Sequence, residues 1–101
     1  MNYIIYKATS PSGKVYIGLT KKTLDERKKE HIWFSKSENT NNRPFPSALK
    51  KYNYEFMWEI IETNLTLEQA EQKEIYYIEF YKSTDRQFGY NLSAGGLAGS
   101  I

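Results

Sequence analysis

One carboxylate stands where the surrounding helical pattern calls for an apolar side chain. The neighbouring residues repeat at the three-and-four spacing of a buried helix face: Leu67, Ala70, Tyr77 and Tyr81. Glu74 occupies the remaining position of this series. Because an ionised carboxylate on an inward face is costly unless a cation or several hydrogen bonds compensate it, Glu74 needs a partner. That partner is either Arg27 or a lysine in a buried ion pair, or a metal ion.

The residue types in the chain restrict which metal could bind there. The chain contains no Cys and one His, so it lacks the thiolate and imidazole cluster that zinc prefers. A hard cation such as Mg²⁺ can be held by one carboxylate together with phosphate oxygens of a substrate. If Glu74 binds a metal, Mg²⁺ is the expected ion, with Mn²⁺ as a substitute.

Arg27 and His31 form a second pair with chemical potential. They are four residues apart in a segment with helical character, so their side chains project from one face. A guanidinium can clamp a phosphate through two hydrogen bonds, and an imidazole can hold or transfer a proton. Since basic, solvated helix faces are common, this pair alone does not establish a site.

A β-hairpin is expected to present two tyrosine hydroxyls on one face. Residues 3–9 and 14–19 are rich in β-branched and aromatic residues. The intervening Ser-Pro-Ser-Gly predicts a type I turn with Gly13 in a left-handed conformation. This loop sets Tyr6 opposite Gly18 and makes Tyr16 its diagonal neighbour. Gly18 is expected to leave open space across from Tyr6; the alternative for the tyrosines is ordinary core packing.

Together these residues match the needs of phosphodiester hydrolysis. That reaction requires an activated water, stabilisation of negative charge and a protonated leaving group. The chain offers a hydroxyl pair, a guanidinium, an imidazole and a carboxylate for these tasks: Tyr6, Tyr16, Arg27, His31 and Glu74.

The remaining pattern supplies the elements that must position these groups. Two capping boxes, at 23–26 and 66–69, predict helices that run from residue 24 to about 34 and from 67 to about 81. Between them the sequence predicts an exposed loop at 35–43, a short helix at about 47–52 and a third strand at 56–62. The fold class expected from these elements is an α/β (α+β) sandwich.

Length and composition bound the domain organisation. The 101 residues suit one domain, predicted at 1–93 with a Gly- and Ala-rich tail or linker at 94–101. A formal net charge of +2 does not by itself argue for nucleic-acid binding. The absence of cysteine and of signal-peptide or membrane-spanning patterns predicts a soluble intracellular protein, as in the cytoplasm of a bacterial or phage-infected cell.

The motifs, in their order, resemble those of the GIY-YIG nuclease family. Ile4-Ile5-Tyr6 and Tyr16-Ile17-Gly18 resemble the paired signature, with Ile4 in place of its glycine. Arg27 and His31 stand where the family helix carries Arg and His, Glu74 stands at the metal-binding Glu, and Gly89-Tyr90-Asn91 resembles the closing motif. The resemblance covers almost the whole chain, and the pattern is most similar to that of phage and intron-borne homing endonucleases.

The resemblance implies a three-stranded antiparallel sheet flanked by helices and a Mg²⁺-dependent endonuclease. In the implied mechanism Glu74 binds the metal, Arg27 binds the scissile phosphate and His31 supports proton transfer. Tyr6 or Tyr16 activates the water, with Tyr6 preferred as general base. The substrate-binding residues are then Lys14, Gly18, Arg27 and Asn91, where Lys14 is a further phosphate contact and Asn91 orders the site.

The expected substrate is double-stranded DNA, cut with little sequence preference by this domain alone. In such homing endonucleases a linker and a separate C-terminal DNA-binding region follow the nuclease domain, and no such region is present in these 101 residues. Two other readings remain: a catalytically inactive nucleic-acid-binding module, and a structural or protein-interaction domain in which Glu74 pairs with a basic side chain.

Overall fold

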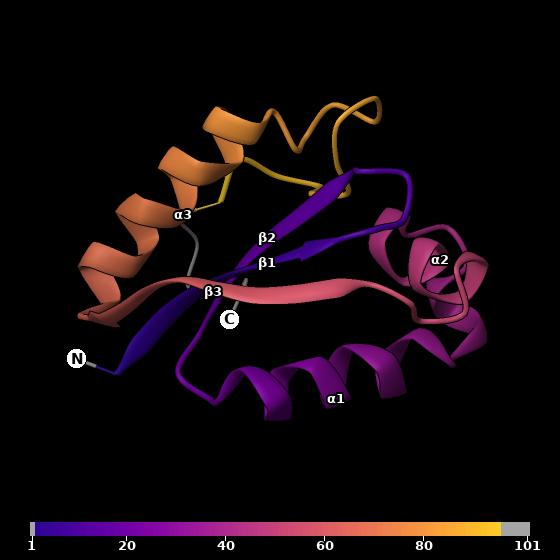
Figure 1. Cartoon of the computed structure of the whole chain (residues 1–101), viewed down its shortest axis with the longest axis horizontal. Helices are drawn as coiled ribbons and strands as arrows, with labels where there is room; N and C mark the ends of the chain where they lie inside the picture. Colours follow the sequence, from indigo (N-terminus) through magenta and orange to yellow (C-terminus); the bar gives the residue numbers. More distant parts are fainter. Residues whose placement is uncertain (1, 96–101) are drawn as a thin grey trace.

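A three-stranded antiparallel sheet forms the centre of the molecule. The computed structural model describes residues 2–95 and contains strands β1 (Tyr3–Thr9), β2 (Val15–Thr20) and β3 (Met57–Leu65) in the order β2-β1-β3. Helix α3 (Leu67–Tyr81) covers one face, and α1 (Leu24–Ser35) and α2 (Pro44–Lys51) lie on the other (Figure 1). The predicted fold class is confirmed. No helix within residues 2–95 is long and apolar enough to cross a membrane.

The hairpin has the register that its turn predicts. The Ser10 N–H donates to the Lys14 carbonyl and the Gly13 N–H to the Ser10 carbonyl, both at 2.9 Å. Gly13 has a φ of +90°, the left-handed conformation that the turn requires. Tyr6 consequently pairs with Gly18 across the two strands.

Gly18 does not leave the open space that the sequence predicts. A Cβ built on this residue would lie 2.3 Å from the Tyr6 hydroxyl oxygen, because the Tyr6 ring lies directly across the glycine. The space is therefore filled by the chain itself and is closed to a ligand. The Tyr6 and Tyr16 rings are diagonal neighbours, as predicted, with centroids 6.3 Å apart.

Both predicted capping boxes are present. In α1 the Thr23 side chain accepts from the Glu26 N–H, and the Glu26 side chain accepts from the Thr23 N–H. Thr66 and Gln69 form the same reciprocal pair at the start of α3. Each box satisfies backbone donors that the first helical turn leaves without partners.

The structure differs from the sequence-based expectation at α2, in the predicted loop and at the end of β3. Helix α2 begins at Pro44 and ends at Lys51, earlier than predicted, because proline at a first helical position lacks only an N–H that has no helical acceptor. The predicted loop contains a short 3₁₀ helix, Glu38–Thr40. Strand β3 continues to Leu65, past Asn64 in a left-handed conformation, since Leu65 pairs with Tyr3 after a register shift.

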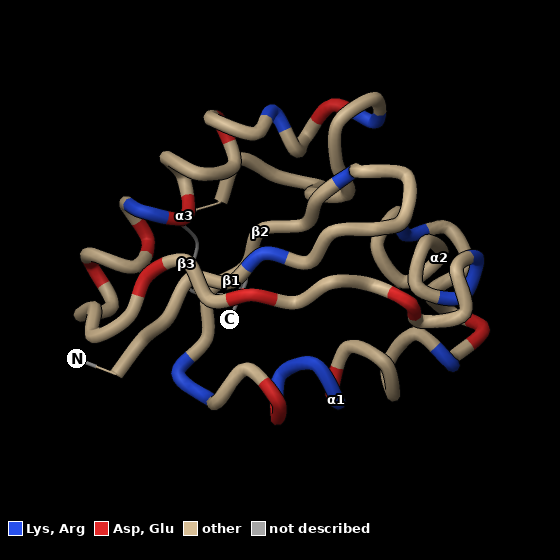
Figure 2. The backbone as a smooth tube through the Cα atoms, in the orientation of Figure 1, with Lys and Arg blue, Asp and Glu red and all other residues tan. Residues whose placement is uncertain are grey.

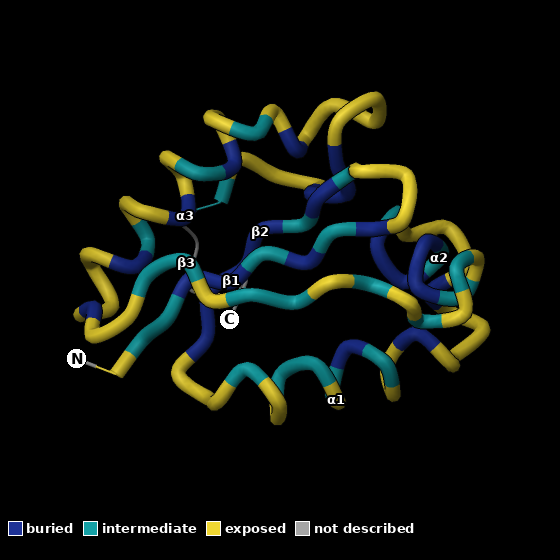
Figure 3. Tube along the Cα trace, in the orientation of Figure 1, coloured by how far each residue is buried: buried dark blue, intermediate teal, exposed yellow. Residues whose placement is uncertain are grey.

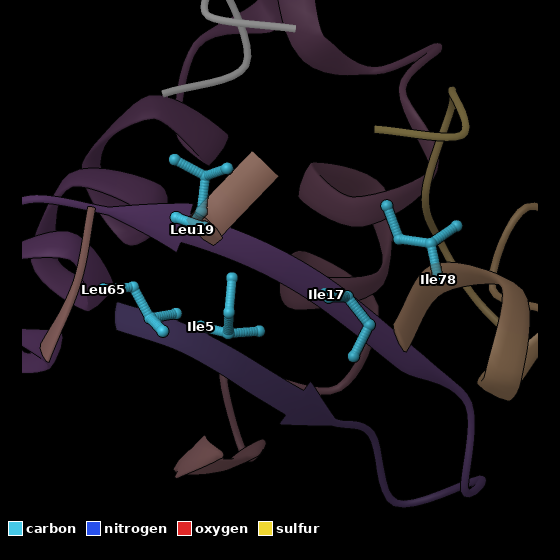
Figure 4. Packing of buried hydrophobic residues seen from close by; sticks show 6 residues of the cluster. Ile5, Ile17, Leu19, Leu65 and Ile78 are labelled. Atoms are coloured by element: carbon cyan, nitrogen blue, oxygen red, sulfur yellow. The ribbon is translucent and has the colours of Figure 1, made fainter. Parts of the chain in front are cut away.

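Two buried clusters hold the helices against the sheet. The cluster under α3 contains Ile5, Ile17, Leu19, Leu65, Ala70 and Ile78 (Figure 4). The cluster on the opposite face is centred on α2 and contains Ala8, Phe45, Ala48, Leu49 and Tyr90. Buried segments follow β1, β2 and the inner sides of the helices (Figure 3). Leu67 is exposed, so its predicted place on the buried face of α3 is wrong, and Ile78 is buried instead.

The C-terminal segment completes the outer edge of β2. The Val15 N–H donates to the Phe88 carbonyl at 3.1 Å, and the Tyr90 N–H donates to the Val15 carbonyl at 2.9 Å. The Asn91 side chain continues this pairing, since its Oδ1 accepts from the Ile17 N–H at 2.9 Å and its Nδ2 donates to the Ile17 carbonyl at 2.8 Å. The amide of Asn91 thus replaces the peptide group of a further strand.

Replacing Asn91 with alanine is expected to destabilise the fold. The substitution leaves the buried N–H and C=O of Ile17 without their partners, which costs about 2 to 3 kcal/mol of unfolding free energy. Urea denaturation measures this loss, with Asn42→Ala in an exposed loop as the control. Equal stability of the two variants would contradict the role of Asn91 at this edge.

Candidate active site

A cleft of about 870 Å³ borders β2, an edge strand of the sheet. Its lining includes side chains from β2, α1, α3 and the C-terminal segment: Tyr16, Arg27, His31, Glu74 and Asn91. Because β2 is an edge strand, α1 on one face of the sheet and α3 on the other can both reach the same cleft. The fold therefore brings together residues that are far apart in the sequence.

Tyr6 lies behind this cleft and does not line it. Its side chain is 1% exposed, and its hydroxyl oxygen lies 2.7 Å from Nε2 of His31, in a hydrogen bond whose direction follows the tautomer of the ring. Burial, together with the neighbouring Tyr16, raises the pKa of Tyr6 well above its usual value, and the charge of Arg27 opposes this rise. Tyr6 therefore keeps its proton near neutral pH.

Tyr16 is held at the wall of the cleft. Its ring stacks on Phe45 with centroids 4.0 Å apart and planes inclined by 2°. The His31 ring meets it edge-on, with centroids 5.4 Å apart. Burial raises the pKa of the Tyr16 hydroxyl, and Arg27 opposes this shift. Tyr16 is thus a rigidly placed neutral hydroxyl.

His31 is buried among aromatic side chains and is neutral at pH 7. Its ring lies 4.9 Å from Phe45 and 5.9 Å from Trp58, measured between centroids. Burial lowers the pKa of His31 to about 3, and the charge of Arg27 lowers it further in the same direction. A neutral imidazole has one nitrogen that can accept a proton.

Arg27 presents a guanidinium toward the cleft. Its Nη1 donates to Glu30 Oε1 at 3.0 Å, and Lys22 binds the other oxygen of the same carboxylate. The Nε of Arg27 is buried and has no hydrogen-bond partner among residues 2–95. Arg27 lines the cleft, and a guanidinium can donate two hydrogen bonds to a phosphate.

Glu74 is 2% exposed and projects from α3 into the lining of the cleft. Its inward position agrees with the sequence pattern. The chain passes close to it at Gly95, where a Cβ would lie 3.0 Å from Glu74 Oε1.

The donor set around Glu74 suits some cations better than others. Within residues 2–95 there is no group of three or more His, Cys, Asp or Glu side chains that could enclose a metal. Glu74 would have to share an ion with water and phosphate oxygens, which fits Mg²⁺ and does not fit a closed zinc site.

The other sequence-predicted site residues divide between the cleft and its surroundings. Asn91 lines the cleft, but both ends of its amide bind Ile17. Gly18 is enclosed behind Tyr6. Lys14 lines a second, smaller pocket of about 260 Å³. Residues 96–101, most of the predicted tail, lie outside the described residues.

Sequence reasoning missed the aromatic residues that surround His31. Phe45 and Trp58 come from α2 and β3, and their packing on the imidazole depends on contacts between distant segments. At the rim of the cleft it also missed Trp33, which is 79% exposed, and Arg43. The surplus of aromatic residues was the one available signal, and it does not identify positions.

The comparisons with known proteins agree with this architecture. The model of the GIY-YIG catalytic domain matches residues 2–91. A solved structure of the catalytic domain of intron endonuclease I-TevI, a mutant with a glutamate replaced by alanine, is similar with a TM-score of 0.78 and 20% identity, covering 94% of this chain and 97% of that one. No curated protein sequence matches the chain. The match over residues 2–91, together with the shared fold, shows that the chain belongs to the GIY-YIG catalytic domain family.

Proposed function

We propose that this chain is a metal-dependent DNA endonuclease domain that hydrolyses phosphodiester bonds. The observation that carries the proposal is the convergence of Glu74 from α3 with Arg27 and His31 from α1 in one cleft. A carboxylate, a guanidinium and a neutral imidazole together can bind a metal ion, a phosphate and a proton. Family membership and the likeness to an intron endonuclease domain support the same reaction.

Glu74 is the proposed metal ligand, and Mg²⁺ is the proposed ion. When bound, Mg²⁺ would supply stabilisation of the negative charge that develops on the phosphate and on the leaving oxygen. The place of Glu74 in the lining of the cleft supports this role, because carboxylate oxygens are ligands that Mg²⁺ prefers.

Arg27 is the proposed ligand of the scissile phosphate. Its pairing with Glu30 fixes the guanidinium, and Arg27 lines the cleft, where N–H groups of the guanidinium can donate to a phosphate oxygen. Contacts of this kind address the sugar-phosphate backbone and carry no sequence information. The domain alone is therefore expected to cut double-stranded DNA with little preference, and targeting would come from an attached DNA-binding region.

The two tyrosines are proposed to have different roles. Tyr16 lines the cleft, so its hydroxyl can hydrogen-bond the attacking water, whereas Tyr6 is enclosed and bonds to His31. His31 lies beside Tyr16, and a phosphate bound at Arg27 would offset one of the causes that lower the His31 pKa, so His31 is proposed to support proton transfer from the water. Tyr6 then acts as a positioning residue that orients the imidazole. The burial of Tyr6 thus favours Tyr16 over the sequence-based preference for Tyr6 as the group that contacts the water.

The role of Glu74 is tested by Glu74→Gln, which keeps the shape of the side chain and removes its charge. We expect nicking of supercoiled plasmid in Mg²⁺ to fall at least about 100-fold, because a neutral amide binds Mg²⁺ poorly. Glu79→Gln, at an exposed position of the same helix, should cut like the parent protein. Undiminished, EDTA-sensitive cutting by a folded Glu74→Gln variant would refute the assignment.

Phenylalanine substitutions separate the tyrosines, since they delete only the hydroxyl. Tyr16→Phe is expected to lower kcat about 100-fold with little change in KM. Tyr6→Phe is expected to lower kcat less, about 10-fold, and to shift the pH profile, because it removes the hydrogen bond to His31. Tyr3→Phe is the control. A larger kcat loss in Tyr6→Phe than in Tyr16→Phe would reverse the two roles.

The neutrality of His31 is tested through stability in acid. The pKa of His31 is about 3 in the folded protein, whereas an unfolded chain has the ordinary value near 6.5. Between these two pH values the unfolded chain binds a proton that the folded protein does not. The free energy of unfolding therefore decreases as the pH falls below about 6.5. Relative to pH 7, the parent protein should lose about 2 to 3 kcal/mol more at pH 4.5 than His31→Gln does. Urea denaturation at both pH values measures the difference, and equal losses would contradict a neutral His31.

A further inference from the structure

A second pocket with a basic lining lies next to the cleft. Its cationic side chains come from the hairpin, from α2 and from the loop after α3: Lys14, Lys51 and Arg86. These three segments meet at one end of the molecule, where Lys and Arg positions gather (Figure 2). Among the described residues, no Asp or Glu lines this pocket. Its positive charge is therefore not neutralised by a carboxylate in its wall.

The three cationic side chains of this pocket form no ion pairs with Asp or Glu among the described residues. Within residues 2–95, the ion pairs involve other lysines and Arg27, and none involves Lys14, Lys51 or Arg86. Arg86 donates to the Thr84 carbonyl at 3.0 Å and to the Asn91 carbonyl, which fixes the guanidinium on the segment that completes β2. An arginine held in this way keeps other N–H donors for a ligand.

The electrostatic environment of a neighbouring tyrosine agrees with a positive pocket. The pKa of Tyr52 is lowered by a hydrogen bond with Ser12 and by the charges of Lys51 and Lys14. The ammonium of Lys51 lies 5.3 Å from the centre of the Tyr52 ring. Positive charge at this position favours an anionic ligand.

The pocket and the cleft share a wall. Pro44 and Tyr90 line both of them. Asn91 connects them as well, because this residue lines the cleft and its backbone carbonyl accepts from Arg86. A nucleic-acid strand whose phosphate lies at Arg27 can therefore continue across Pro44 and Tyr90 into the basic pocket.

We propose that the pocket formed by Lys14, Lys51 and Arg86 binds a second, uncleaved phosphate of the DNA strand that enters the cleft. The inference rests on the proposed function for the identity of the ligand, since a strand that places one phosphate at Arg27 carries further phosphates on either side. The pocket fixes the direction in which the strand crosses the cleft. It binds backbone and contributes affinity without sequence preference.

The test compares two adjacent lysines in the last turn of α2. Lys51 lines the pocket, whereas Lys50 hydrogen-bonds to the Asn41 side chain outside it. Lys51→Glu and Lys50→Glu change net charge and helix-end charge equally, so general electrostatics affects both alike. Each is made in the Glu74→Gln background, and binding to duplex DNA is measured by fluorescence anisotropy in EDTA between about 50 and 200 mM salt.

We expect Lys51→Glu to weaken binding about tenfold more than Lys50→Glu. The slope of log affinity against log salt should become shallower by about one for Lys51→Glu alone. Lys14→Ala, on the hairpin side of the same pocket, should also make the slope shallower, and it gives a second reading if Lys51→Glu does not fold. Three results would overturn the phosphate-pocket proposal. They are equal effects of Lys51→Glu and Lys50→Glu on affinity, an unchanged salt slope in Lys51→Glu, and no binding of duplex DNA by the parent protein.

Cutting of plasmid DNA is measured separately in proteins that retain Glu74. The nuclease proposal and the phosphate-pocket proposal can therefore fail independently. If DNA binding depends on Lys51 but no cutting is seen, the phosphate-pocket proposal stands and the nuclease proposal is rejected. Cutting in which Lys51→Glu and Lys50→Glu have the same KM and kcat keeps the nuclease and rejects the pocket. If both stand, Lys51→Glu raises KM and leaves kcat unchanged.

Discussion

The structure depends on how the backbone hydrogen-bonding groups at the outer edge of β2 find partners. An edge strand presents backbone N–H and C=O groups that need partners, and here the same edge borders the cleft. A further full strand would close this edge and separate α1 from α3. The chain instead uses the short segment from Phe88 to Asn91, which pairs with Val15 and Ile17 and ends in a side-chain amide. The edge is thereby completed while both helices still reach the cleft.

The charges of the cleft act on one another because they share a partly buried space. Arg27 lowers the pKa of His31 and opposes the rise in the pKa of both tyrosines, whereas Glu74 adds to that rise. The Arg27 guanidinium therefore lowers the pKa of the tyrosine hydroxyls, whereas the Glu74 carboxylate raises it. A phosphate at Arg27 and a cation at Glu74 would weaken both influences at once. Burial remains the largest cause of each of these pKa shifts, and bound groups would change only the contributions of the two charges.

Local patterns in the sequence predicted the parts of this site that local physics determines. The turn at Gly13 set the hairpin register, the capping boxes set where α1 and α3 begin, and helical spacing placed Glu74 on an inward face. Features that depend on distant contacts were not predictable in this way. The aromatic enclosure of His31 by α2 and β3 is one such feature. Resemblance to a family supplied the grouping of the residues, which no local pattern contains.

Gly18 shows how a correct register can still lead to a wrong interpretation. Pairing Tyr6 with Gly18 was correct, but an absent side chain does not imply an empty space. The Tyr6 ring occupies the position of the missing Cβ, and from there its hydroxyl reaches His31. A methyl group at residue 18 would lie 2.3 Å from the Tyr6 hydroxyl oxygen and 2.4 to 2.8 Å from two of its ring atoms, and would displace the hydroxyl. Glycine on one strand and tyrosine on the other are therefore one structural unit, and its function is to hold the imidazole at the wall of the cleft.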